Sequence, residues 1–250
     1  MSTNIFVPPA QFDFTSLIQD SRNTTKRLKA LFFGGPGTGK TTSALCVETP
    51  TLAIDTQRGS EPYVGVIEGL NRVPLIDIDQ IELFVADMVA HPERYAQFKT
   101  VTVDMITDIH DRIRMKWLNF YRMSHRNPAY QLQGSDWTNP KMEFQQFLDN
   151  LMKIDKHVIL VAGESSNYLP GTFMQIDPKN PIKPDCPADA AHWPDVLIHF
   201  RKVSEDNYVA RRHKSRLIDP KTKKQLIPEM IEHVDNWTFG RSEERRVGKE

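Results

Sequence analysis

The chain has 250 residues, 32 Lys and Arg against 32 Asp and Glu, and 39% hydrophobic residues, which is enough for one large domain with a substantial core. A formal net charge of zero excludes a uniformly basic nucleic-acid-binding protein, so any such binding must come from a local basic patch. No apolar run approaches the roughly 18–20 residues that span a bilayer, so we expect no membrane association.

The chain start and the cysteines predict a compartment. Residues 1–9 lack the charged and then apolar layout of a signal peptide. Cys46 and Cys186 are two isolated thiols without metal-ligand spacing, which is typical of a reducing environment. We therefore expect a cytoplasmic protein.

The most informative segment is a glycine-rich loop near the start of the predicted domain. Residues 28–33 form a short apolar run that predicts a buried strand, and residues 41–47 predict the first turns of a helix. Between them, four of the 12 glycines of the chain fall within six residues, and the segment matches G-x-x-x-x-G-K-[ST]. The predicted nucleotide-binding residues are Gly34, Gly35, Pro36, Gly37, Thr38, Gly39, Lys40, Thr41 and Thr42.

Each residue type in this loop has a chemical reason. A β-carbon would keep backbone N–H groups from wrapping a phosphate, hence the glycines. The start of a helix adds unpaired donors. We expect Lys40 to reach the β- and γ-phosphates of ATP and the Thr41 hydroxyl to ligate Mg²⁺. The alternative is a glycine-rich turn that merely precedes a helix, which the flanking strand and helix disfavour.

A second strand and an amphipathic helix follow. Thr51–Asp55 predicts the strand, and the segment 56–59 comes directly after it. Residues 79–89 predict a helix with four apolar side chains on one face, and such a stripe is typical of a core-facing helix. These side chains are Ile81, Phe84, Val85 and Met88.

The run from Phe98 to Asp104 is rich in β-branched residues and ends in an acid, the layout of a Walker B strand. A carboxylate at the carboxyl end of a parallel strand beside a phosphate-binding loop can hold Mg²⁺ through its water shell, so we predict Asp104 as the second metal ligand. The alternative is an ordinary strand-end Asp. The next helix is predicted to reach Met123, and its inner side is expected to carry Ile109, Ile113, Trp117 and Phe120.

The rest of the domain continues the alternation. Residues 124–139 form a polar connection, residues 141–154 predict a helix, and residues 157–162 predict a strand. Strands alternating with helices of this length predict an α/β fold with a mostly parallel sheet wound by right-handed crossovers.

The pattern breaks from Gly163 to Pro194, where six prolines interrupt a stretch without apolar periodicity. Long loops inside compact domains are usually functional, and this one begins where ligands of such sheets bind; a surface loop without a role is the alternative. Residues 195–200 and 208–212 then predict an antiparallel hairpin. From Arg201 to Lys224, nine basic residues face three acids, which supplies the local basic patch.

At this point the chain resembles the RecA-type ATPases. The order is a phosphate loop, Asp-x-Gln after the second strand, the strand ending at Asp104, a proline-rich loop, and a hairpin with Lys214-Ser215-Arg216. More narrowly it is similar to the phage RecA-core-only ATPases linked to single-strand annealing and recombination. The resemblance implies a RecA-like P-loop core, a DNA-binding role for the loop from Gly163 to Pro194, and a location in the host cytoplasm if the chain is phage-encoded. It also implies that Lys214 and Arg216 reach the γ-phosphate of a neighbouring subunit; the alternative is a solvated edge of the basic hairpin.

Two positions depart from that family. Gln57 stands where the family usually has a glutamate that polarises the attacking water, and an amide can orient water but cannot accept its proton. Glu61 and Glu164 are possible substitutes, although neither matches the motif position. Gly163-Glu164 stands where relatives often carry a polar or histidine sensor. Hydrolysis is therefore expected to be slow, or to require DNA and a neighbouring subunit.

Three functions remain open. The first is a DNA-dependent ATPase that binds single-stranded DNA as a homo-oligomer with ATP at subunit interfaces, with a single-strand-binding protein as a further partner. Its aromatic contacts to bases would come from Tyr168, Phe173 and Trp193, unless these anchor the loop to the core. The second is a nucleotide-binding assembly switch without turnover, and the third is a P-loop small-molecule kinase.

The domain division has three parts. Residues 1–27 form an N-terminal segment, and residues 28–240 form the ATPase domain. Residues 241–250 resemble the translation of a sequencing-library adapter, which predicts a non-native tail; a solvated charged tail is the alternative.

Overall fold

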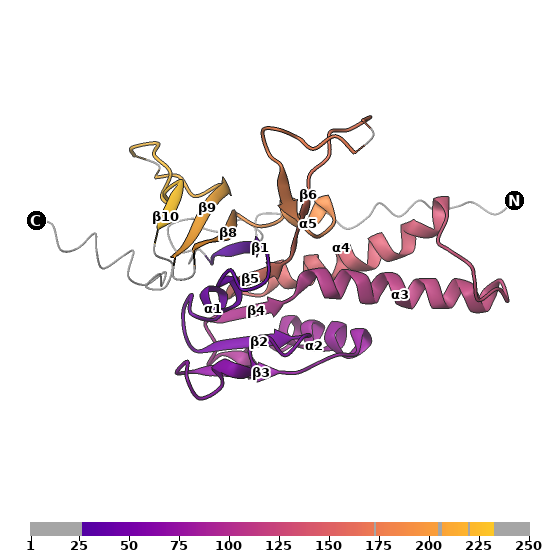
Figure 1. Cartoon of the computed structure of the whole chain (residues 1–250). Helices are drawn as coiled ribbons and strands as arrows, with labels where there is room; N and C mark the ends of the chain where they lie inside the picture. The colour runs from indigo at the N-terminus through magenta and orange to yellow at the C-terminus, as the bar shows by residue number, and fades with distance from the viewer. Residues whose placement is uncertain (1–26, 173, 205–206, 220, 233–250) are drawn as a thin grey trace, which may run out of the picture.

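The computed structural model describes residues 27–172, 174–204, 207–219 and 221–232. One eight-stranded sheet organises them, in the order β10-β9-β8-β1-β5-β4-β2-β3 (Figure 1). The strands from β8 to β3 are parallel, whereas β9 and β10 are antiparallel additions, so the predicted α/β fold with a C-terminal antiparallel hairpin is confirmed. The bounds are β1 Lys29–Gly34, β2 Thr51–Asp55, β3 Leu70–Val73, β4 Thr100–Asp104, β5 His157–Ala162, β8 Val196–Ser204, β9 Asn207–Ser215 and β10 Met230–Glu232.

Helices cover the sheet unequally. The helices α2 (Ile78–Ala90), α3 (Ile106–Ser124) and α4 (Thr138–Lys153) pack on one face, and the short α1 (Lys40–Leu45) packs on the other. Short 3₁₀ turns at Glu61–Tyr63, Pro92–Tyr95 and Gly134–Trp137 join some of these elements. Within the described ranges, no helix is both long enough and apolar enough to cross a membrane.

The alternation of side chains along β1 explains the two layers. Leu31 and Phe33 are fully buried in the cluster that contains α2, α3 and α4, whereas Ala30 and Phe32 are buried in the cluster that contains α1. Successive side chains of a strand point to opposite faces, so a strand with helices on both sides must be apolar throughout. This is why residues 30–33 are apolar without interruption in the sequence.

The strands that lie over α1 carry threonines in place of apolar residues. Thr102 Oγ1 donates to the carbonyl oxygen of Ala44 at 3.2 Å, and Thr51 Oγ1 donates to that of Leu45 at 3.1 Å. Carbonyl groups in the last turn of a helix have no partner within the helix. These hydroxyls therefore fix the short α1, and with it the end of the glycine-rich loop, to the sheet.

The segment from Gly163 to Pro194 has more regular structure than its sequence indicates. β6 (Glu164–Ser166) and β7 (Ile182–Pro184) form an antiparallel ribbon that projects from the sheet (Figure 1), and α5 (Ala188–His192) follows it. The expectation of a loop without regular elements was therefore wrong. A short ribbon does not need alternating apolar residues when much of it faces solvent, so its sequence carries no periodic signal.

One strand was missed, and one expectation was wrong. The sequence did not predict the edge strand β3, whose four residues are all partly exposed or exposed. Phe120 was expected on the inner side of its helix but is 49% exposed. α3 extends beyond the sheet (Figure 1), so its later turns have little core to pack against.

The register aligns the ends of the parallel strands. Asp55 of β2 pairs with Asp104 of β4, which pairs in turn with Val161 of β5, and Phe33 of β1 pairs with Ala162. The carboxyl ends of four strands consequently meet at one level. The glycine-rich loop leaves β1 at this edge.

Candidate functional site

The loop between β1 and α1 can be built only with glycine at particular positions. A Cβ at Gly34 would lie 2.3 Å from the carbonyl oxygen of Phe200 in the neighbouring strand β8, a distance that real Cβ atoms do not show. Gly39, directly before α1, has a φ of 84°, which L residues with side chains rarely adopt. The loop therefore runs against β8 and enters α1 in a conformation that exposes its backbone.

Lys40 is held inside this loop. Its side-chain nitrogen donates to the carbonyl oxygen of Gly35 at 2.9 Å, and the Thr38 hydroxyl donates to the same oxygen at 2.8 Å. Burial lowers the pKa of Lys40, and the charges of Asp104 and Glu164 partly oppose this shift. An ammonium group that is buried and only partly compensated is suited to bind an anion such as a phosphate.

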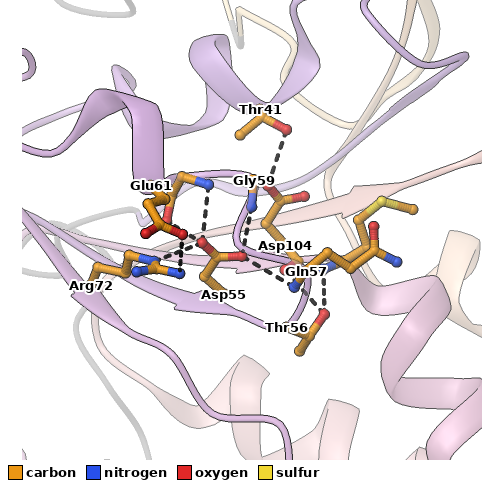
Figure 2. A network of polar contacts seen from close by, with 10 residues as sticks. Thr41, Asp55, Thr56, Gln57, Gly59, Glu61, Arg72 and Asp104 are labelled. Atoms are coloured by element: carbon orange, nitrogen blue, oxygen red, sulfur yellow. Dashed lines mark hydrogen bonds and ion pairs between the residues drawn. The ribbon is translucent and has the colours of Figure 1, made fainter.

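Thr41 and Asp104 meet across the site. The Thr41 hydroxyl donates to Asp104 Oδ2 at 3.0 Å, although the two residues are 63 positions apart (Figure 2). Asp104 is only 3% exposed, and burial raises the pKa of its carboxyl to about 6, with a further rise from the charge of Asp55 and a reduction from Thr41 and Lys40. Asp104 is thus a carboxylate whose ionised form is poorly compensated in the protein alone.

This pair fits a magnesium ion. A hydroxyl and a carboxylate oxygen are both hard ligands, and Mg²⁺ commonly binds one or two protein groups together with substrate phosphates and water. Among the described residues, no group of three or more His, Cys, Asp or Glu side chains could hold a metal, so an all-protein cage is absent there. Thr41 and Asp104 would hold the ion, which would neutralise phosphate charge when bound.

Asp55 organises the segment behind Asp104 (Figure 2). Its buried carboxylate accepts from the backbone N–H groups of Gln57 at 3.2 Å, Gly59 at 3.0 Å and Ser60 at 3.0 Å, from the Ser60 hydroxyl, and from Arg72 Nε at 2.9 Å. Burial alone would raise the pKa of Asp55, but these hydrogen bonds and the guanidinium charge hold it below its ordinary value. No role was predicted for Asp55, and the available signals were its position at a strand end and its place in the Asp-x-Gln motif.

Gln57 is close to this edge but differs from Asp104 in its surroundings. Its backbone bonds to Asp55, and its side chain is exposed. Thr56, the residue before it, bonds to the Asp104 backbone, with 2.8 Å between Thr56 N and the Asp104 carbonyl oxygen. The structure thus brings the segment containing Gln57 to β4, while the contribution of its amide to water activation stays a prediction.

Lys214 and Arg216 lie toward the start of β8, away from the end of β1 where the loop begins. Lys214 pairs with Leu197 near the start of β8, whereas Gly34 pairs with Phe200. The Lys214 ammonium donates to the carbonyl oxygens of Ala191 at 3.1 Å and His192 at 2.8 Å, and Arg216 Nη2 donates to that of His192 at 2.9 Å. Both cations therefore bind the end of α5, and their action on a neighbouring subunit stays a prediction.

The aromatic residues predicted for the long loop separate into two kinds. Tyr168 is 47% exposed and contributes an isolated bridge to Ile176 within the projecting ribbon. Trp193 instead is partly buried and packs against the core, so it anchors the segment. Phe173 lies outside the described residues, as do residues 1–26 and 241–250, which carry the predicted N-terminal segment and non-native tail.

Comparison with models of protein families gives a match. Residues 26–185, more than half of the chain, match a family model described as an AAA domain, so the chain belongs to this family of P-loop NTPases. The matched range contains the glycine-rich loop, β2, and the strand that ends at Asp104. No curated protein matches the chain. The family supports nucleotide binding and possible ATPase activity, and its members generally bind ATP with Mg²⁺.

Replacing Asp104 by Asn tests the cost of the buried carboxylate in the metal-free protein. A folded-state pKa of about 6 against an ordinary value of 3.8 means that the folded protein binds this proton more tightly than the unfolded chain does. Protonation of Asp104 therefore stabilises the folded state near pH 4, and this stabilisation is lost as the pH rises through 6. Above pH 6 we expect Asp104→Asn to exceed the wild type by about 2–3 kcal/mol in free energy of unfolding.

Urea unfolding with a chelator at pH 4.5, 6.0 and 7.5 measures this difference, which should shrink toward the lowest pH. Other titrating groups are common to both proteins, so the difference isolates Asp104. A variant less stable than the wild type at pH 7.5 would contradict the prediction. Added Mg·ATP should stabilise the wild type more than the variant.

Proposed function

We propose that the chain is a RecA-type, DNA-dependent ATPase that binds single-stranded DNA as an oligomer and assists annealing or recombination, similar to the phage RecA-core-only ATPases. The observation that carries the ATPase part is the meeting of Lys40, Thr41 and Asp104 at one edge of the sheet. In this proposal Lys40 binds the β- and γ-phosphates, and Thr41 and Asp104 hold Mg²⁺. Phosphoryl transfer needs mainly such positioning and charge stabilisation.

The ribbon that follows β5 supports the DNA part. Beyond β6 it exposes Tyr168, Met174, which is 70% exposed, and Ile176, together with the exposed side chains of Lys179 and Lys183. Binding of single strands without sequence preference combines aromatic faces that stack on bases with cations that follow the backbone. The ribbon offers both, and it begins directly at the nucleotide-binding edge.

A second basic segment lies at the same edge. β8 continues past Phe200, the partner of Gly34, and there exposes Arg201 and Lys202, with Arg211 exposed on the adjacent strand β9. Lys202 lies 5.6 Å from the ring centroid of Tyr208, and Tyr208 approaches Gly39 of the loop. These cations can bind phosphates of a strand that also contacts the ribbon, so the neutral total charge does not oppose DNA binding.

Oligomer formation with ATP at the interfaces, and a single-strand-binding protein as partner, are further parts of the proposal. Within one chain Lys214 lies opposite Leu197, three residues before the partner of Gly34, and both cations bind the end of α5, so in this proposal they act on a neighbour. A cation supplied in this way can accelerate phosphoryl transfer by about 10³–10⁵-fold.

One alternative has an observation in its favour. The exposed Gln57 amide cannot take a proton from water, which fits an assembly switch that binds ATP without turnover. A small-molecule kinase shares the phosphate-binding loop, and phosphate appearing on an added nucleoside would favour it.

The first test measures phosphate release with and without single-stranded DNA. We expect the wild type to bind Mg·ATP and to hydrolyse it faster with DNA, because DNA and a neighbouring subunit complete the site. Lys40→Ala should lose most ATP affinity and turnover, since the buried ammonium is removed, while its circular dichroism spectrum is unchanged. ATP-dependent assembly without phosphate release would support the assembly switch instead.

The second test separates stacking from charge in DNA binding. Tyr168→Ala should weaken binding of a single-stranded oligonucleotide by about 5- to 100-fold, the range for loss of one stacked base. Tyr168→Phe keeps the ring and serves as the matched control. Lys202→Ala should instead reduce the slope of log affinity against log salt by about 0.7. Fluorescence anisotropy across a salt series measures both, and unchanged affinity in Tyr168→Ala would argue against stacking on the ribbon.

The third test asks whether Arg216 acts between subunits. Lys40→Ala lacks a working loop and Arg216→Ala lacks the cation, so each alone should be nearly inactive. After random mixing, about a quarter of the interfaces would join an intact loop to an intact Arg216, since head-to-tail interfaces combine different surfaces. Recovery of ATPase activity on mixing is the expected result. If both variants are inactive and their mixture stays inactive, Arg216 does not act in trans.

A further inference from the structure

Glu164 lies against the phosphate-binding loop. It is the first residue of β6, two positions after the end of β5, and a Cβ at Gly35 would lie 3.1 Å from its Oε1 atom. Its charge also opposes the fall in the pKa of Lys40, as does that of Asp104. Glu164 lies outside the motif G-x-x-x-x-G-K-[ST], yet it is close to Lys40, the residue predicted to contact the γ-phosphate.

His199 holds the other oxygen of this carboxylate. His199 Nε2 lies 2.7 Å from Glu164 Oε2, and the residue is buried in the middle of β8, with its side chain 7% exposed. The ring stacks on Phe33 of β1 with a centroid distance of 4.6 Å and an interplanar angle of 9°. His213 packs edge-on against both rings. The imidazole is thus fixed by packing and can donate to an ionised Glu164.

Other acidic groups near this edge are already committed. Asp55 is occupied by Arg72 and the N–H groups of its own loop, and Asp104 accepts from Thr41. Glu61 faces Arg72, with 3.6 Å between Glu61 Oε2 and Arg72 Nη2. Glu164 differs because His199 bonds to Oε2, whereas Oε1 faces the loop and has no hydrogen bond within the described part of the chain.

We propose that Glu164, positioned by His199, is the general base of the ATPase reaction and takes over the function that the amide of Gln57 cannot perform. This inference rests on the proposed function. The water oxygen bonds to the γ-phosphorus while the bond from that phosphorus to the β–γ bridging oxygen breaks. ADP leaves with the electron pair, and the water proton passes to Glu164 Oε1 and then to solvent. Nothing is oxidised or reduced.

Glu164→Gln tests the base. The amide keeps a polar contact with His199 but cannot take the proton, so we expect kcat with single-stranded DNA to fall by about 10²–10⁴-fold. The dissociation constant of Mg·ATP should stay within about threefold, because the phosphate contacts remain. Glu68→Gln makes the same chemical change at an exposed position outside the site and should behave as the wild type.

The outcomes are distinct. Turnover of Glu164→Gln within about threefold of the wild type overturns the inference and leaves the ATPase intact. Loss of ATP affinity in this variant also overturns it, since Glu164 would then be a binding residue. Absence of turnover in the wild type removes the proposed hydrolysis and the inference together, and it is read from the wild type alone.

His199 has its own test as a positioning residue. His199→Phe keeps an aromatic ring against Phe33 but removes the donor, whereas His199→Gln restores a donor. We expect kcat to fall about tenfold in His199→Phe at unchanged KM, with recovery in His199→Gln, because a hydrogen bond to a charged group is lost and regained. Equal kcat values for the two variants would overturn the positioning role.

Discussion

The structure depends on a carboxylate that the protein alone does not neutralise. Asp104 is buried at the end of β4 with a hydroxyl as its side-chain partner, whereas Asp55, next to it in the sheet, is surrounded by N–H donors and a guanidinium. The pKa values of the two carboxyls accordingly shift in opposite directions. The two acids are paired in the sheet but have different roles. Asp55 fixes the backbone of residues 57–60, whereas the charge of Asp104 is poorly compensated and can be neutralised by a cation.

The order of the strands decides which groups meet at this site. β5 lies between β1 and β4, so the loop after β1 and the acid after β4 are separated by one strand. Lys40 and Thr41 bridge that gap from α1, which hydroxyls of β2 and β4 hold at its far end. The interposed strand also brings its own continuation, Glu164, beside Gly35. The strand that separates the loop from Asp104 thus also places a second carboxylate, that of Glu164, at the site.

The sequence predicted what depends on neighbours along the chain. The glycine-rich loop, the apolar strands and the acid ending β4 are local patterns, and the structure has each in the expected place. Contacts between distant residues were not predictable in this way. Glu164 and His199 are 35 positions apart, and only the parallel pairing of β8 and β5 with β1 brings them together. The ribbon after β5 was missed because its strands are short and lack an alternating pattern.

The positions of Lys214 and Arg216 have a consequence for the proposed oligomer. In the single chain both cations bind the last carbonyl groups of α5, and such groups are unpartnered when a helix ends. To reach a neighbouring nucleotide these cations must leave α5, which is joined to β7 and, through the ribbon, to Glu164. The end of α5 would then lose its donors at the moment when the neighbouring site gains a cation. The ribbon proposed to bind DNA, the proposed base Glu164 and the helix end that holds these two cations therefore lie on one segment of the chain, from residue 164 to residue 192.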